Sequence, residues 1–198
     1  MAAPATPKYK LILLGDFGVG KTTLFHRVRT GSFLEGPHGV GQHLCMCEKV
    51  LPVRHGRSNL QAQISLWDTA GEERFLSLSS CYFRRADAVL LLYSLHGPLS
   101  FDSLTHWVHV ARHYCAEADI FILGNKSDLE SQVPEEKAER FSVEHSTSGR
   151  FRVSAKTGEN VERCLQEMVD WLFRKKEFQR SGLAAPPEEL GYYKRCGC

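Results

Sequence analysis

The sequence predicts an α/β fold: a mostly parallel sheet of about six strands with helices on both of its faces. Apolar, strand-sized runs alternate with helical patterns along the chain, as they do when helices connect parallel strands. The length of 198 residues, the formal net charge of +2 and the hydrophobic content of 42% suit one globular domain with a short tail. We expect a disordered N-terminus over residues 1–8, a folded domain over 9–178 and a flexible tail over 179–198.

The first half of the chain contains three of the expected strands. Tyr9–Leu14 is a buried strand, followed by a glycine-rich turn and a helix over about Lys21–Arg29. Strands at about Leu44–Val53 and Leu60–Trp67 follow without a helix between them, and the polar segment 54–59 is typical of a hairpin connection. This pair should therefore be antiparallel and form one antiparallel edge of the sheet.

The second half of the chain continues the alternation. Strands are expected at Ala88–Tyr93, Asp119–Leu123 and Phe151–Val153, and helices at Phe101–Cys115, Pro134–His145 and about Asn160–Phe178. The first and last of these helices have an apolar face at three-to-four spacing, formed by Phe101, Leu104, Val108 and Ala111 and by Val161, Leu165, Met168, Val169 and Leu172. Ser181-Gly182 and Pro186-Pro187 then end the helical pattern and indicate a flexible linker.

Composition and charge argue against several classes of protein. The near-neutral charge, with one basic run at residues 174–176, argues against nucleic-acid binding. No apolar run is long enough to cross a membrane, and residues 1–8 lack a secretory signal pattern, so we expect a cytosolic protein. Seven cysteines without regular spacing indicate reduced thiols. Cys45 and Cys47 could begin a metal site, but no second pair of ligands follows, and two half-buried strand residues are the preferred interpretation.

A phosphate-binding loop follows the first strand. Its residues, Gly15-Asp16-Phe17-Gly18-Val19-Gly20-Lys21-Thr22, match the pattern of a glycine, four residues and Gly-Lys-Thr between a strand and a helix. Glycines let backbone N–H groups close around phosphates, and the helix N-terminus adds positive potential. Lys21 should reach the β- and γ-phosphates and the Thr22 hydroxyl should ligate Mg²⁺, with Thr23 also at the site.

Two later segments predict that the bound base is guanine. Asn125-Lys126-Ser127-Asp128 follows a strand, and the Asp128 carboxylate can accept both N1–H and N2–H of guanine, a pair of donors that adenine lacks. Ser154-Ala155-Lys156 follows the next strand, where a backbone N–H can meet guanine O6. Both segments stand at carboxyl ends of expected strands, where ligands bind in such sheets.

A fourth segment, Trp67-Asp68-Thr69-Ala70-Gly71, ends another strand and completes the resemblance to a known family. From Tyr9 to Phe178 the chain resembles a small GTPase of the Ras superfamily, with the P-loop NTPase fold of a small G domain. The resemblance implies GTP or GDP with Mg²⁺ as cofactors, Asp68 in the magnesium shell and the Gly71 N–H at the γ-phosphate. It also implies that Lys21, Gly71 and Glu72 take part in catalysis, Glu72 standing where the family carries a Gln that positions water.

The chain most resembles the Rab branch of this superfamily. Residues 66–75, Leu-Trp-Asp-Thr-Ala-Gly-Glu-Glu-Arg-Phe, and residues 82–86, Tyr-Phe-Arg-Arg-Ala, are similar to two Rab segments. Trp67 and Phe83, with Leu44, would form the hydrophobic patch that Rab effectors contact, although the aromatic rings could also be core residues. The resemblance implies a Rab escort protein, a GDP-dissociation inhibitor, an exchange factor and effectors as partners in vesicle trafficking.

The last three residues, Cys196-Gly197-Cys198, resemble the Cys-X-Cys terminus of doubly geranylgeranylated Rabs. Two lipid chains give stable anchoring, whereas a single chain gives only marginal membrane binding. The rest of the tail is nearly uncharged, so the lipids would have to supply the anchoring. We therefore expect the protein on the cytoplasmic face of an intracellular membrane, with a cytosolic pool.

Three departures from the family pattern bear on hydrolysis. Phe17 replaces a small residue and would crowd the γ-phosphate and an arginine finger, unless its ring points to solvent. Glu72 adds negative charge beside a developing negative charge. Gly39-Val40-Gly41 aligns with the family's Thr-Ile-Gly, so the threonine that closes over Mg²⁺ is missing, and the His38 imidazole would be a poor replacement.

Two functions therefore remain open from the sequence. The first is a Rab-type GTP/GDP switch with slow hydrolysis, which the intact phosphate- and magnesium-binding residues favour. The second is a membrane-tethered scaffold that holds nucleotide with little turnover, which the three departures favour. A P-loop kinase for a small molecule is disfavoured by the guanine segments and the lipidation signal.

Overall fold

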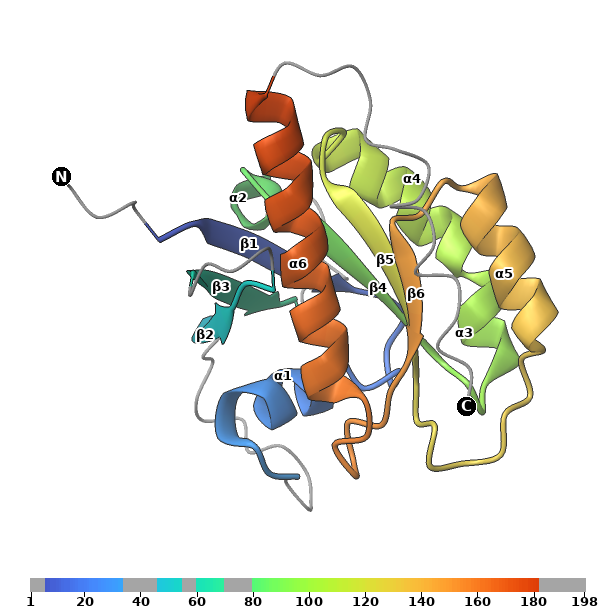
Figure 1. The fold of residues 1–198 in the computed structure, drawn as a ribbon. Helices are drawn as coiled ribbons and strands as arrows, with labels where there is room; N and C mark the ends of the chain where they lie inside the picture. The colour runs from blue at the N-terminus through green and yellow to red at the C-terminus, as the bar shows by residue number, and fades with distance from the viewer. Residues whose placement is uncertain (1–5, 34–45, 55–59, 70–79, 182–198) are drawn as a thin grey trace, which may run out of the picture.

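A six-stranded, mostly parallel sheet forms the centre of the protein (Figure 1). The computed structural model describes residues 6–33, 46–54, 60–69 and 80–181. The strands are β1 (Lys8–Leu14), β2 (Met46–Pro52), β3 (Gln61–Asp68), β4 (Ala88–Ser94), β5 (Asp119–Asn125) and β6 (Gly149–Arg152). They lie in the order β2-β3-β1-β4-β5-β6, with β2 antiparallel to β3 and the other pairs parallel. The α/β fold with one antiparallel edge strand is therefore confirmed.

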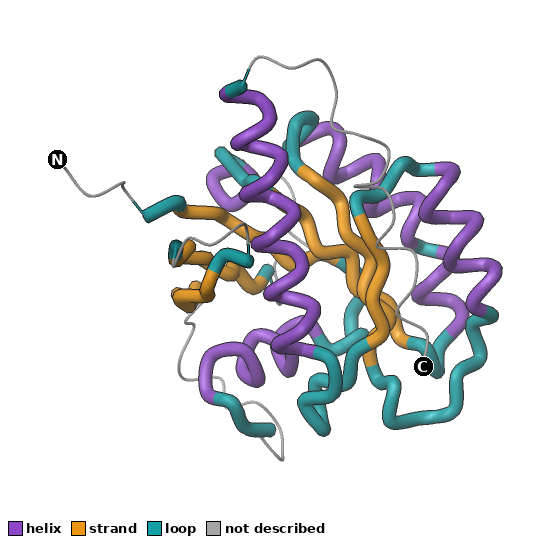
Figure 2. The backbone as a smooth tube through the Cα atoms, viewed as in Figure 1, coloured by secondary structure: helices purple, strands orange, loops and turns teal. Residues whose placement is uncertain are grey.

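Helices cover both faces of this sheet (Figure 2). They are α1 (Lys21–Thr30), α2 (Ser80–Phe83), α3 (Pro98–Asp102), α4 (Leu104–Tyr114), α5 (Glu135–Glu144) and α6 (Val161–Arg180). Side chains of α1 and α6 pack on one face of the sheet, and side chains of α3, α4 and α5 pack on the other. No helix in the described part of the chain is both long enough and apolar enough to cross a bilayer.

The core is divided between the two faces of the sheet. In β1, Leu11 and Leu13 contribute to the core beneath α1 and α6, whereas Ile12 and Leu14 contribute to the core beneath α3, α4 and α5. Every residue of β4 and β5 is buried, as expected of parallel strands covered on both sides. The apolar faces predicted for the helices over 101–115 and 160–178 are buried in these cores and are confirmed.

Several element boundaries differ from the sequence-based expectation. The helix expected over 101–115 is divided into α3 and α4 at Ser103, whose hydroxyl bonds back to the Leu99 carbonyl at 3.2 Å, a contact that bends helices. It also begins earlier, because Pro98 fits the first position of a helix. β6 begins at Gly149 rather than at 151, beside the Phe121 ring, where a Cβ would lie only 3.2 Å from the ring. The single turn α2 was not predicted, and α6 ends at Arg180 rather than near 178.

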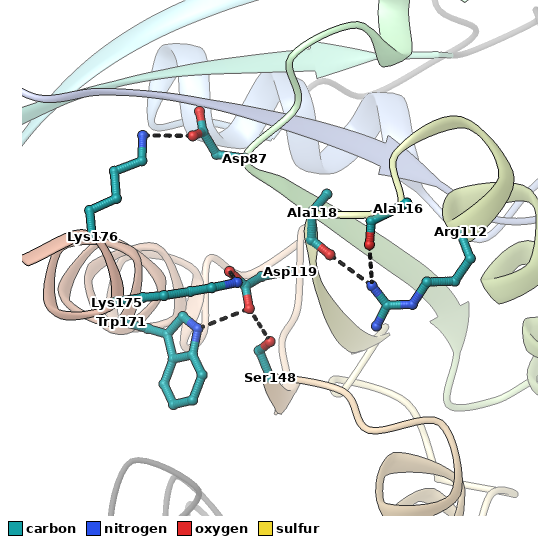
Figure 3. Close-up of polar contacts among 9 residues, drawn as sticks. All are labelled: Asp87, Arg112, Ala116, Ala118, Asp119, Ser148, Trp171, Lys175 and Lys176. Atoms are coloured by element: carbon teal, nitrogen blue, oxygen red, sulfur yellow. Dashed lines mark hydrogen bonds and ion pairs between the residues drawn. The ribbon is translucent and has the colours of Figure 1, made fainter. Parts of the chain in front are cut away.

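Ion pairs anchor the end of α6 to the amino ends of β4 and β5, a region called here the amino edge (Figure 3). Asp119, the first residue of β5, accepts hydrogen bonds from Ser148 Oγ at 2.5 Å, Trp171 Nε1 at 3.2 Å and Lys175 Nζ at 2.8 Å. Asp87, just before β4, pairs with Lys176 Nζ at 2.7 Å. Lys175 and Lys176, two of the three residues in the basic run at 174–176, therefore form ion pairs with acidic residues at the amino edge.

Candidate functional site

The segments singled out in the sequence meet at the opposite end of the sheet, called here the carboxyl edge. Residues 15–22 follow β1, Asp68 ends β3 beside Leu13, Asn125 ends β5, and residues 154–156 follow β6. Parallel strands deliver their carboxyl ends to one edge, which is where ligands bind in open α/β sheets.

The loop between β1 and α1 has the backbone of an anion-binding site. Gly15, Gly18 and Gly20 have φ values of 142°, 79° and 101°, which side chains rarely allow. A Cβ at Gly15 would lie 2.2 Å from the Leu92 carbonyl oxygen, and one at Gly20 would lie 2.3 Å from Asn125 Nδ2. Gly20 is also the N-cap of α1, and no side chain caps this helix, so a phosphate would fit as the acceptor for its first N–H groups.

Lys21 lies folded over this loop. Its side chain is buried, and Nζ donates to the carbonyl oxygens of Gly15 at 2.8 Å and Asp16 at 2.9 Å. A buried ammonium group needs such acceptors. Phosphate oxygens would be stronger acceptors than neutral carbonyls because the bond is then charge-assisted at both ends. Thr22 and Thr23 lie beside Lys21 in the first turn of α1 and are partly buried.

Asn125 joins the phosphate-binding loop to the segment 154–156. Its side chain is only 2% exposed. Nδ2 donates to the Val19 carbonyl at 2.8 Å, and Oδ1 accepts the Ala155 N–H at 3.0 Å. One amide therefore joins Val19, 106 positions before Asn125 in the chain, to Ala155, 30 positions after it.

The acidic residue that would select guanine is held by a neighbouring hydroxyl. Ser154 is fully buried, and its Oγ donates to Asp128 Oδ1 at 2.5 Å. Asp128 itself is exposed, so its carboxylate is accessible to a ligand while one oxygen is oriented by the protein. Lys126 has a φ of 67°, and such left-handed conformations in residues other than glycine cluster at functional sites. Lys156 is exposed.

Asp68 and Thr69 extend β3 toward the phosphate-binding loop. Both residues are buried, and Thr69 Oγ1 donates to the Leu13 carbonyl at 2.7 Å. Asp68 thus supplies a buried oxygen donor, the chemistry that Mg²⁺ prefers, at the edge where the phosphates would lie. Gly71 and Glu72 fall outside the described residues, as do residues 38–41, Cys196 and Cys198, and their roles stay predictions.

Phe17 projects from the phosphate-binding loop. Its side chain is 87% exposed, the highest value among the large hydrophobic residues that stand exposed in the described chain. The ring is therefore not part of the core and faces solvent. Its effect on a γ-phosphate or an arginine finger stays a prediction.

Sequence reasoning missed a residue that holds the same loop. Trp107, on α4, donates from Nε1 to Asp16 Oδ1 at 2.8 Å across 91 positions in the chain. The sequence does show a tryptophan near an apolar helix face, and a buried indole N–H usually donates to some acceptor. No pattern in the sequence identifies that acceptor as Asp16.

Of the three residues predicted to form a surface patch, Trp67, Phe83 and Leu44, the structure corrects Phe83. Phe83 is 2% exposed and stacks on Tyr114 with ring centroids 4.7 Å apart, so it is a core residue. Trp67 is partly buried and makes an edge contact with Tyr82 at 5.7 Å. Leu44 lies outside the described residues.

Three cysteines, Cys47, Cys115 and Cys164, are buried and free. Burial raises the pKa of the Cys115 thiol to about 11 and also raises the pKa values of Cys47 and Cys164. These groups are neutral thiols at physiological pH and poor nucleophiles. Within the described ranges no three His, Cys, Asp or Glu side chains gather to hold a metal ion; Cys45 lies outside these ranges.

Comparison with known proteins agrees with this geometry. Residues 10–174 match the family model described as the Ras family. The chain is 39% identical over 167 residues to the Ras-related protein Rab-37 of Homo sapiens, covering 80% of this chain and 72% of that protein. It is 40% identical over 161 residues to Rab-26 of Drosophila melanogaster, covering 79% of this chain but only 40% of that protein, and 34% identical over 183 residues to human Rab-26, covering 91% and 67%. This chain therefore belongs to the Ras family and, within it, to the Rab-type small GTPases.

Proposed function

We propose that this chain is a membrane-anchored Rab-type small GTPase that binds GTP and GDP with Mg²⁺, acts in intracellular vesicle trafficking and hydrolyses GTP slowly. The observation that carries the proposal is the Asn125 side chain, which joins the phosphate-binding loop to the segment 154–156 beside Asp128. The relatives, named as Ras-related Rab proteins, support the same class of function.

The described residues fit a guanine nucleotide and its metal ion. Lys21 would hold the β- and γ-phosphates, Thr22 and Asp68 would hold Mg²⁺, and Asp128 would accept the two guanine N–H groups. When bound, Mg²⁺ would neutralise charge on the phosphate oxygens. The uncapped N-terminus of α1 would add backbone donors to the same phosphates.

Slow hydrolysis is proposed from the residues around the γ-phosphate. Phe17 exposes its ring on the phosphate-binding loop, where an arginine finger from an activating protein would have to enter. Glu72 can orient water but brings a negative charge, and Gly39 offers no hydroxyl to the metal. Each change removes a contribution to the transition state and leaves the binding of GDP intact.

The same three residues favour a second candidate function, a nucleotide-bound scaffold with little turnover or switching. In that case the guanine and phosphate contacts would serve to stabilise the fold. Bound ligand stabilises a protein by a free energy that grows with the logarithm of the ligand's excess over Kd, so this role requires only tight binding.

Membrane attachment is proposed from the tail. Cys196 and Cys198 would each carry a geranylgeranyl group, which places the protein on the cytoplasmic face of an intracellular membrane with a cytosolic pool. A Rab escort protein, a GDP-dissociation inhibitor, an exchange factor and effectors are the partners that the family implies. Replacing both cysteines by serine should move the chain to the soluble fraction of a cell lysate; unchanged membrane association would contradict the anchor.

The test of the proposed function is the nucleotide content of the purified full chain, followed through a single turnover of loaded GTP. We expect co-purified GDP or GTP, and conversion of GTP to GDP that is slow and little accelerated by a Rab-activating protein. No conversion over many hours would favour the scaffold, and fast, strongly stimulated conversion would contradict slow hydrolysis. Asp128→Asn should shift preference from guanine to xanthine nucleotides, whereas preparations that bind ATP as well as GTP would refute guanine selection.

A further inference from the structure

The side chain of Arg27, on α1, bonds three backbone carbonyls from two separate segments. Nε donates to the Ala155 carbonyl at 3.0 Å, Nη2 donates to the Lys156 carbonyl, and Nη1 donates to the Gly31 carbonyl at 2.6 Å. The first two acceptors are neighbours in the segment that follows β6. The third is the left-handed residue that ends α1, with φ 75°.

An arginine is the side chain that fits this arrangement. Its planar guanidinium carries five N–H donors in a fixed fork, whereas the single nitrogen of a lysine cannot span three separated acceptors. The guanidinium also packs on Gly158, where a Cβ would lie 3.6 Å from Nη1, an ordinary contact. Since the Ala155 and Lys156 acceptors are neutral carbonyls, these bonds orient the backbone rather than neutralise the charge of Arg27.

The other side of the same segment is also fixed. The Ala155 N–H donates to Asn125 Oδ1 at 3.0 Å, and the Gly158 N–H closes a turn on the Ser154 carbonyl at 2.8 Å. The Ser154 N–H donates to the Glu159 carbonyl at 3.1 Å, so two of the three N–H groups of residues 154–156 are engaged within the protein. The Ala155 carbonyl accepts from Arg27, and the N–H of the same trans peptide, that of Lys156, therefore points away from Arg27. Loss of the guanidinium would free the carbonyl side of the segment and let its peptide groups rotate.

We propose that Arg27 is a positioning residue for base recognition: by holding the carbonyls of Ala155 and Lys156 it orients the Lys156 N–H toward the 6-oxo group of guanine. This inference rests on the proposed guanine binding. Because Arg27 stands on the helix that begins at the phosphate-binding loop, it ties base recognition to phosphate binding within one rigid element. Its bond to the Gly31 carbonyl also connects the C-terminal end of α1 to residues 154–156.

The test compares Arg27→Met with Arg29→Met, a control at an exposed position on the same helix, in the full chain. The probes are GDP, 6-thio-GDP, which weakens the acceptor at position 6, and IDP, which lacks the 2-amino group that Asp128 would bind. Arg27→Met should weaken GDP binding about tenfold, the effect of one or two lost hydrogen bonds. It should also abolish the preference for GDP over 6-thio-GDP while keeping the preference for GDP over IDP. Arg29→Met should behave as the wild type.

Arg27→Lys should resemble Arg27→Met, because it keeps the charge but not the fork. If Arg27→Met leaves the GDP to 6-thio-GDP ratio unchanged, or lowers it together with the GDP to IDP ratio, the positioning role is refuted. A wild type that fails to prefer GDP over ADP would instead refute the proposed function.

Hydrogen exchange without added nucleotide tests the positioning separately. In Arg27→Met the amides of residues 154–158 should exchange about tenfold faster, while the amides of β4 keep their wild-type rates. Unchanged exchange over 154–158 would overturn the inference even if nucleotide affinity fell. Faster exchange throughout β4 would show a general loss of stability and would overturn the inference as well. Arg27→Gln is a second variant for these measurements, because it keeps a polar side chain.

Discussion

The contacts that fix the loops at the carboxyl edge differ in kind from the ion pairs at the amino edge. At the carboxyl edge, side chains bind backbone: Asn125 bonds Val19 and Ala155, and Lys21 bonds Gly15 and Asp16. At the amino edge, Lys175 pairs with Asp119 at 2.8 Å and Lys176 with Asp87 at 2.7 Å, beside Arg112, which donates to the backbone carbonyl of Ala118 at 3.0 Å (Figure 3).

This difference assigns the two edges different roles: one in nucleotide binding, the other in the stability of the fold. A side chain that binds backbone fixes the path of a loop and leaves N–H groups and the Asp128 carboxylate to meet a ligand. An ion pair satisfies both of its own charges and needs no ligand. Changes at the carboxyl edge should therefore alter nucleotide binding, and changes at the amino edge should alter the free energy of unfolding.

The largest effect is expected for Asn125→Ala at the carboxyl edge. The variant leaves the buried Val19 carbonyl and Ala155 N–H without their partner, and each such loss costs about 1–3 kcal/mol. Titration with a fluorescent GDP analogue should show a binding free energy weaker by roughly 2–6 kcal/mol, the sum of the two losses. Affinity within a factor of two of the wild type would contradict the joining role of Asn125.

Asp119→Ala should have the opposite signature at the amino edge. It removes the acceptor of Lys175, Trp171 and Ser148. Because the Lys175 side chain is 33% exposed, water can hydrate the ammonium group left behind, and the free energy of unfolding should fall by about 1–3 kcal/mol. Denaturant unfolding would measure the loss, and GDP affinity of the folded variant should stay unchanged. A large fall in affinity would show that the two edges are coupled.

High pH should lower the free energy of unfolding by ionising a buried thiol near the amino edge. The Cys115 thiol, which donates to the Phe83 carbonyl at 3.2 Å, has its pKa raised to about 11 from an ordinary 9.0 by burial. Below pH 9 the thiol is neutral in both states; above it the unfolded thiol ionises first, so stability falls as pH rises from about 9 to about 11. The contribution is about 2 kcal/mol, and denaturant unfolding at pH 8 and pH 11 would measure it.

Cys115→Ser is the matched control for this titration, because a serine hydroxyl can keep the bond to Phe83 without ionising in this range. The pH dependence should be smaller in the variant. Buried Tyr93, whose pKa is raised to about 12, contributes in both proteins from pH 10 upward. Identical pH profiles for wild type and variant would rule out Cys115 as a cause.

The smallest effect is expected for a pair of tryptophan variants, one at each edge. Trp107→Phe removes the bond to Asp16 in the phosphate-binding loop and should weaken GDP binding by about 1 kcal/mol. Trp171→Phe removes the bond to Asp119 and should lower the free energy of unfolding by about 1 kcal/mol while leaving GDP affinity unchanged. If Trp107→Phe and Trp171→Phe lowered GDP affinity equally, the proposed difference between the two edges would be wrong.

Much of the candidate site could be predicted because its residues follow strands directly. Gly15, Asn125 and Ser154 each stand within two residues of a strand end, and parallel strands place such positions together. Trp107, Arg27 and Ser103 could not be assigned in the same way. Their roles depend on which carbonyl or carboxylate lies opposite, and that partner comes from another part of the chain or from the local path of a helix.

The sequence by itself determined the fold class, the phosphate-binding loop and the choice of guanine as the expected base. Local patterns carry these features, because hydrophobic period, glycine spacing and strand-end position are all properties of short segments. Only the tertiary structure decided that Phe83 is core, that Lys175 and Lys176 are bound within the fold, and that Arg27 reaches the segment 154–156. These features depend on burial and on contacts between distant residues, which exist only once the sheet and helices have packed.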